Sequence, residues 1–164
     1  MGTGARIDTC NVIGGGVSST DRIGGFIQPT SVLFRARFDK NNGMVAGFTQ
    51  YMRCMIVQDR QQIAFTAPVA ADLLTVATDF MSPMPLANVG RFNILYDQVI
   101  KMDVGSDYGK YVSKYINKGL LPIGFSSTSS GSISKNGLYV LTISDDSIAS
   151  PSVRWNLRLR FTDK

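Results

Sequence analysis

The sequence predicts an all-β domain built from two antiparallel sheets. Its dominant hydrophobic period is two, with β-branched and aromatic residues gathered into short runs. Gly, Ser, Asn, Asp and Pro separate these runs, as they do in sandwiches and barrels. The chain has 164 residues and shows no linker or internal repeat, so we expect a single domain over residues 1–164.

Eight runs have the length and composition of strands. They are Ala5–Asn11, Gly25–Phe38, Gln50–Gln58, Arg91–Asp103, Lys110–Asn117, Leu120–Phe125, Gly137–Ser144 and Val153–Asp163. Between the third and the fourth, apolar residues recur at intervals of three and four after Pro68, which predicts one short helix at about residues 69–79. Eight strands with one helical insertion favour an eight-stranded, double-sheet jelly roll.

The first run is weakly patterned, whereas the second has two distinct faces. Even-numbered residues from Val32 to Phe38 are apolar and point to one side. Odd-numbered residues, which include Arg35 and Arg37, point to the other. Pro29 predicts a bend or an edge position in this strand.

The middle runs differ in how much of each face is apolar. Gln50–Gln58 is apolar almost throughout, so we expect cover on both faces, and Gly137–Ser144 is of the same central-strand type. Arg91–Asp103 alternates along its length, and Lys118-Gly119 forms a turn between the two short runs after it. The Ser- and Gly-rich stretch Ser126–Lys135 predicts an exposed loop.

Composition argues against catalysis. The chain has no His and no Glu, which removes the usual general base, the Ser/His and Cys/His pairs and the commonest metal ligand. We therefore expect no enzyme, no cofactor and no metal site. Cys10 and Cys54 lack the spacing of a redox or metal motif and predict buried free thiols. The apolar runs are too short to insert in a membrane.

Four short motifs together resemble a family of viral coat proteins. They are YMRCMIVQDRQQ (Tyr51 to Gln62), GRFNILYDQVIKMD (Gly90 to Asp103), LYVLTISDD (Leu138 to Asp146) and the final basic strand ending in RFTD (Arg160 to Asp163). Their order and spacing resemble the capsid (coat) proteins of circular Rep-encoding single-stranded DNA (CRESS-DNA) viruses. They are also similar to the coat protein of satellite tobacco necrosis virus.

The resemblance implies a viral jelly roll with strands B to I in two sheets, BIDG and CHEF. It further implies a structural capsid protein that self-assembles into a small icosahedral shell, most simply of sixty copies (T=1), around single-stranded DNA or, as in the satellite virus, RNA. Its location would be the virion, and the host nucleus or cytoplasm during assembly. Family members usually begin with a basic arm, whereas this sequence opens on MGTGARIDT. Either the arm has been removed or the virus packages its genome differently, and we favour removal.

The last strand offers a candidate nucleic-acid site. Its arginines Arg154, Arg158 and Arg160 alternate with apolar residues, so they share one face. If strand I lies between B and D, Arg6 and Arg53 join them in a patch of five guanidiniums suited to phosphates. Such contacts are to the backbone and independent of base sequence. Three interpretations stay open for this face: genome binding, ion pairs with neighbouring subunits, and plain solvation.

A rival function also fits the pattern. A lectin-like or trimeric ligand-type jelly-roll binding module shows the same alternation of apolar and polar residues. Such a module would be a monomer or small oligomer, whereas a coat protein assembles into particles.

Overall fold

The computed structural model describes residues 5–17, 21–39, 49–62, 66–103, 109–145 and 151–163. Its strands are β1 (Arg6–Thr9), β2 (Phe26–Asp39), β3 (Gln50–Asp59), β4 (Phe92–Met102), β5 (Lys110–Ile116), β6 (Ile123–Phe125), β7 (Ile133–Lys135), β8 (Gly137–Ser144) and β9 (Ser152–Asp163). One helical turn, α1 (Ala70–Leu73), and one 3-10 turn, η1 (Leu86–Asn88), lie between β3 and β4. Each of the eight predicted runs contains a strand, and β7 is a ninth strand that was not predicted. Residues 1–4, at the start of the sequence, lie outside the described residues, and so does any prediction about a basic arm there.

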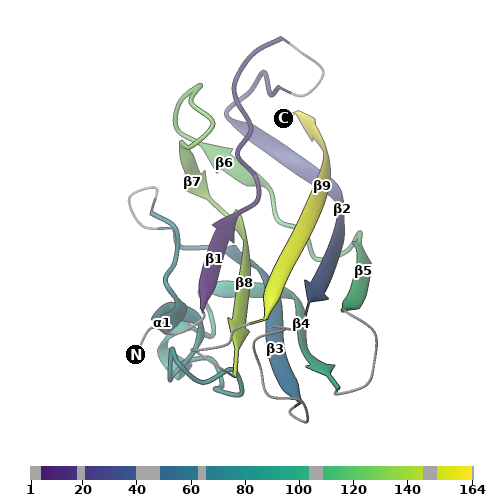
Figure 1. Cartoon of the computed structure of the whole chain (residues 1–164). Helices are drawn as coiled ribbons and strands as arrows, with labels where there is room; N and C mark the ends of the chain where they lie inside the picture. The colour runs from purple at the N-terminus through teal and green to yellow at the C-terminus, as the bar shows by residue number, and fades with distance from the viewer. Residues whose placement is uncertain are drawn as a thin grey trace.

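The strands form two antiparallel sheets (Figure 1). One has the order β1-β8-β3-β4, and the other has the order β5-β2-β6-β7 with β9 paired to β2. Strand β9 follows β2 from Ile27 to Asp39. Strand β5 pairs with β2 over Val32–Phe38, so β5 and β9 occupy opposite edges of β2.

The predicted sheets BIDG and CHEF, drawn on our assignment of the runs, are wrong. The run assigned to strand I is β9, and it pairs with β2 instead of lying between β1 and β3. That central place belongs to β8, while β4 also joins this sheet. Burial explains the exchange. Every residue of β8 is buried, as a strand covered on both faces requires, whereas β9 alternates half-buried and exposed residues and suits an edge.

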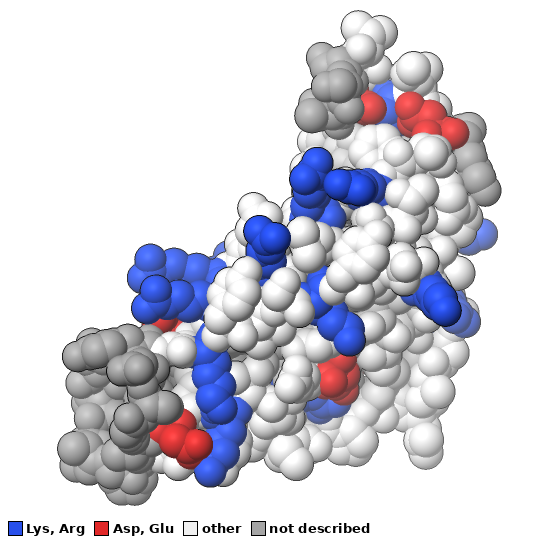
Figure 2. Space-filling view, turned by 90° about the vertical axis from the view of Figure 1, so that its right-hand side faces the viewer, with Lys and Arg blue, Asp and Glu red and all other residues white. Residues whose placement is uncertain are grey.

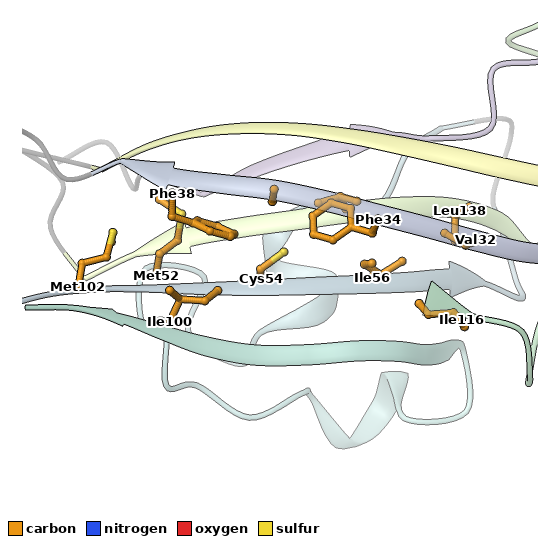
Figure 3. Close-up of a cluster of buried hydrophobic side chains, with 12 residues drawn as sticks. Val32, Phe34, Phe38, Met52, Cys54, Ile56, Ile100, Met102, Ile116 and Leu138 are labelled. Atoms are coloured by element: carbon orange, nitrogen blue, oxygen red, sulfur yellow. The ribbon is translucent and has the colours of Figure 1, made fainter. Parts of the chain in front are cut away.

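The main core lies between the two sheets (Figure 3). Strand β2 contributes the predicted inward face, from Val32 to Phe38, and β3 contributes Met52, Cys54 and Ile56. The apolar side chains of β9 pack against this cluster from the edge, and the Trp155 ring lies 6.2 Å from the Phe34 ring. Trp155 is therefore part of the core wall, although it is only half-buried.

The segment after β3 covers the outer face of the β8-β3 pair. Leu73 and Leu74 are fully buried there against side chains of β3 and β8. The predicted helix at about residues 69–79 is present only as the single turn α1, so its predicted length is wrong. Beyond Leu74, the N–H groups bond outside a helix: Thr75 donates to the Pro83 carbonyl and Val76 to the Ser82 hydroxyl.

Two local features concern the edges of the second sheet. At Pro29, where a bend or an edge position was predicted, the β2-β9 pairing shifts register between Pro29 and Ser31. The predicted exposed loop Ser126–Lys135 is wrong at its end, where Ile133 is buried and starts β7. Ile133 belongs to a small core cluster with Ile27, Ile123 and Phe125, and β7 pairs with β6.

Candidate nucleic-acid interface

The structure divides the five predicted arginines between two sheets. Arg6 lies on β1 and Arg53 on β3, in the four-stranded sheet. Arg154, Arg158 and Arg160 lie on β9, in the other sheet. The predicted single patch of five guanidiniums therefore does not form, because it required β9 to lie between β1 and β3.

Arg53 is engaged within the fold. Its Nε and Nη2 donate to the two carboxylate oxygens of Asp97 at 2.7 and 2.6 Å, and Nη1 donates to the carbonyls of Phe80 and Ser82. The hydrogen bonds to Asp97 raise the pKa of this guanidinium. With its side chain only 13% exposed, Arg53 holds β3, β4 and the covering segment together and offers little to a phosphate. Arg6 is exposed, and its Nε pairs with Asp8 at 2.8 Å.

A second ion pair connects the same two strands in the opposite sense. Arg91, just before β4, donates from Nε and Nη2 to the carboxylate of Asp59 at the end of β3, at 3.0 and 2.7 Å. The Asp59 side chain is fully buried, and these bonds raise the pKa of Arg91. Each strand segment thus gives one arginine to a carboxylate of the other. These residues belong to the two motifs YMRCMIVQDRQQ and GRFNILYDQVIKMD.

The arginines of β9 share their face with arginines of β2. Strand β9 alternates as predicted, with Arg154, Arg158 and Arg160 exposed. Arg154 lies opposite Arg37 in the antiparallel register, and directly opposite residues point to the same face of a sheet. Arg35, two residues before Arg37, is exposed on the same face. We name the face that carries Arg35, Arg37, Arg154, Arg158 and Arg160 the basic sheet face.

One carboxylate compensates part of this charge. Arg37 pairs with Asp39 at 2.6 Å, and a guanidinium nitrogen of Arg154 lies 3.8 Å from the same side chain. Within the described part of the chain, Arg35, Arg158 and Arg160 have no ion pair. Asp39 therefore compensates charge at the Arg37 and Arg154 end of this face, while Asp21 and Asp163 line the same pocket as Arg158 and Arg160.

Two exposed tyrosines extend the same face. Tyr111 of β5 lies opposite Arg37, and Tyr115 lies opposite Leu33, so both rings stand on the outer side of the sheet. Their exposed fractions are 65% and 57%. Figure 2 looks onto the side of the molecule that carries β5, β2 and β9, and Lys and Arg side chains spread across it with fewer Asp among them.

Sequence reasoning missed Arg35, Arg37 and both tyrosines as members of this site. Their alternation was visible, because KYVSKYIN places Tyr111 and Tyr115 four residues apart on one face of a strand. What the pattern lacked was the pairing of β2 with both β5 and β9. That pairing brings residues from three distant segments to one surface.

The two cysteines and the aspartates were also considered as possible redox or metal-binding groups. Cys10 and Cys54 are both free, as predicted, and burial raises the pKa of each to about 12. Cys54 is fully buried, whereas Cys10 is half-buried. In the described ranges, no group of three or more Cys or Asp side chains gathers in a way that could hold a metal ion. No helix in those ranges is long and apolar enough to cross a membrane.

The sequence matches no family model, and no curated protein matches it.

Proposed function

We propose that this protein is a structural viral coat protein. In this proposal it self-assembles through its own copies, most simply sixty of them, into a small icosahedral shell around a single-stranded DNA genome. Its place is then the virion.

Sheet order is the observation on which this proposal chiefly rests. In the coat-protein jelly roll, one sheet runs B-I-D-G, and the observed order β1-β8-β3-β4 matches it when β8 takes the place of I and β4 that of G. Strand β5 then takes the place of H and pairs with β2, in the place of C. On this assignment the segment between β3 and β4 replaces strands E and F, β9 is an added strand beside C, and β6 and β7 have no counterpart among strands B to I.

The two reciprocal ion pairs lie within two of the motifs on which the proposed resemblance rests. The motif residues Arg53, Asp59, Arg91 and Asp97 all take part in the two pairs described above. These pairs fix β3 beside β4.

The proposed contact with the genome is made through phosphates and is independent of base sequence. The basic sheet face carries five guanidiniums, and among the described residues Asp39 is the one carboxylate that forms ion pairs with them. Arginine suits this use because its forked donors match the oxygens of a phosphate. Affinity for nucleic acid is then expected to fall steeply as salt is raised.

Electron microscopy of the purified full chain tests assembly directly. At high protein concentration and moderate salt, with and without single-stranded DNA, we expect closed particles of uniform size. A strict monomer under all these conditions would contradict the proposal. A monomer or trimer that binds a sugar or a receptor would instead support the binding-module alternative.

A further inference from the structure

We propose that the basic sheet face binds single-stranded nucleic acid by two kinds of contact, with its arginines on phosphates and with Tyr111 and Tyr115 stacked on unpaired bases. This inference rests on the proposed function for its ligand, because it names how the genome would be held. The inference goes beyond the proposed function because it assigns contacts with the bases, and not only with the backbone, to particular side chains.

The arginines provide an unneutralised track along the sheet. Arg158 and Arg160 are two residues apart on β9, which places them about 6.6 Å from each other along the strand. Arg35 lies on β2 opposite Asn156, two residues along the strand from Arg158, so the two arginines are about 8 Å apart on the diagonal. The three side chains are exposed and form no ion pair within the described part of the chain. Their donors are therefore free for phosphate oxygens.

The tyrosines lie beside this track on the neighbouring strand. Tyr115, Leu33 and Arg158 form one row across β5, β2 and β9, and Tyr111, Arg37 and Arg154 form another. An aromatic ring and a guanidinium therefore stand at the two ends of each row, about 9.6 Å apart at two strand spacings. A nucleotide laid along the row can place its phosphate at one end and its base at the other.

Exposure is the feature that suits these two rings to stacking. Among the described residues, the exposed large hydrophobic side chains include three aromatic ones: Tyr111, Tyr115 and, at 50%, Phe26. An exposed ring gains little from folding, since its apolar surface stays in water. Stacking with a base would cover that surface, and every base has a face that can stack. Bases in a duplex are already stacked, so this contact selects single strands.

The spacing of the rings sets the length of strand that engages both. Tyr111 and Tyr115 are four residues apart on β5, or about 13 Å. That distance corresponds to about four nucleotides at a stacked rise of 3.4 Å. We therefore expect a marked gain in affinity between oligonucleotides of two and of six nucleotides, with little further gain per subunit beyond that.

Fluorescence anisotropy of the full-length protein with labelled oligo(dT) tests the proposal. Replacing Tyr115 by Leu removes the ring's π system, and we expect affinity for oligo(dT) to fall at least about fivefold. The variant Tyr115→Phe keeps the ring and is the matched control, so it should bind within about twofold of the wild type. Binding of inorganic polyphosphate, which has charge but no bases, should be unchanged in both variants.

The arginines are tested by salt dependence. Each phosphate contact contributes about 0.7 to the slope of log affinity against log salt for a single strand. The triple variant R35A/R158A/R160A should therefore lower that slope by about 2. The exposed Arg6 on the other sheet is the control, and R6A should leave the slope unchanged.

The outcomes separate this inference from the coat-protein proposal. Equal binding of oligo(dT) by Tyr115→Leu and wild type would overturn stacking, and an unchanged slope in the triple variant would overturn the arginine track. A surface used for contact between subunits would instead show variants that fail to form particles while binding polyphosphate normally, which also overturns the inference. A protein that forms no particle but shows the tyrosine and arginine effects would support the inference and contradict the coat-protein proposal.

Discussion

Replacing Asp59 by Asn is expected to lower the free energy of unfolding by about 3 kcal/mol. The Asp59 side chain is fully buried, and its oxygens accept hydrogen bonds from Arg91 at 3.0 and 2.7 Å. Removing one partner of a buried ion pair typically costs about 3–5 kcal/mol, because the other charge is left uncompensated. Arg91 keeps Asp72 at 3.4 Å and is 12% exposed, so the lower end of that range applies.

Two other aspartates serve as graded controls. Asp97→Asn should cost about 2 kcal/mol, because Arg53 loses a charge-assisted pair but still donates to two carbonyls. Asp8→Asn should cost at most about 0.5 kcal/mol, because its partner Arg6 has a side chain that is 65% exposed. The double variant D59N/R91M should be more stable than D59N alone, since it also removes the Arg91 charge that D59N leaves without its carboxylate partner.

Urea denaturation followed through Trp155 fluorescence measures these differences. A shift of the midpoint at constant slope reports a change in stability. The reasoning would be refuted if D59N were no less stable than D8N, or if the double variant were the least stable of the set. Either result would mean that the Asp59 carboxylate is solvated in the folded protein.

Three further predictions concern the core, the segment that covers it, and the thiols. Phe34→Ala should cost about 3–5 kcal/mol in the same urea assay, because the ring is fully buried between the sheets. Leu74→Ala should lower the free energy of unfolding by about 2–5 kcal/mol, because Leu74 is fully buried. Val76→Ala should be nearly neutral, because Val76 is exposed. Similar costs for the two variants would instead support the longer helix predicted at about residues 69–79. Burial raises the pKa of Cys10 and Cys54 from 9.0 to about 12, so both should resist iodoacetamide at pH 8 until the chain unfolds. The folded state keeps these thiol protons where the unfolded chain loses them, so their contribution to stability is full below pH 9 and is lost as pH rises toward about 12. Urea midpoints at pH 8 and pH 10.5 measure this loss, which should be smaller when both cysteines are replaced by Ala.

Local sequence patterns predicted most of the secondary structure. Alternation located all eight predicted strands, and it also placed Arg154, Arg158 and Arg160 on a single exposed face. The helix was overestimated because intervals of three and four between apolar residues also arise in a folded-back loop. There Leu73 and Leu74 are buried next to each other while Val76 is exposed.

The same patterns could not predict which strands are neighbours in a sheet. Alternation states which face a side chain takes but not which strand lies beside it. Arg53 therefore looked like a free cation, although its partner Asp97 lies 44 residues away on β4. The composition of the strands did hold a usable signal, since the continuously apolar Gly137–Ser144 suits a central place better than the arginine-bearing last strand.

Sedimentation velocity of the purified full chain tests the central claim most directly. At high protein concentration and moderate salt, a sixty-copy shell of 17.9 kDa subunits gives a single fast boundary at about 1.1 MDa (60 × 17.9 kDa). That boundary should carry single-stranded DNA when DNA is present during assembly. A single slow boundary at the mass of one or three chains, with and without DNA, would contradict the assignment as a coat protein.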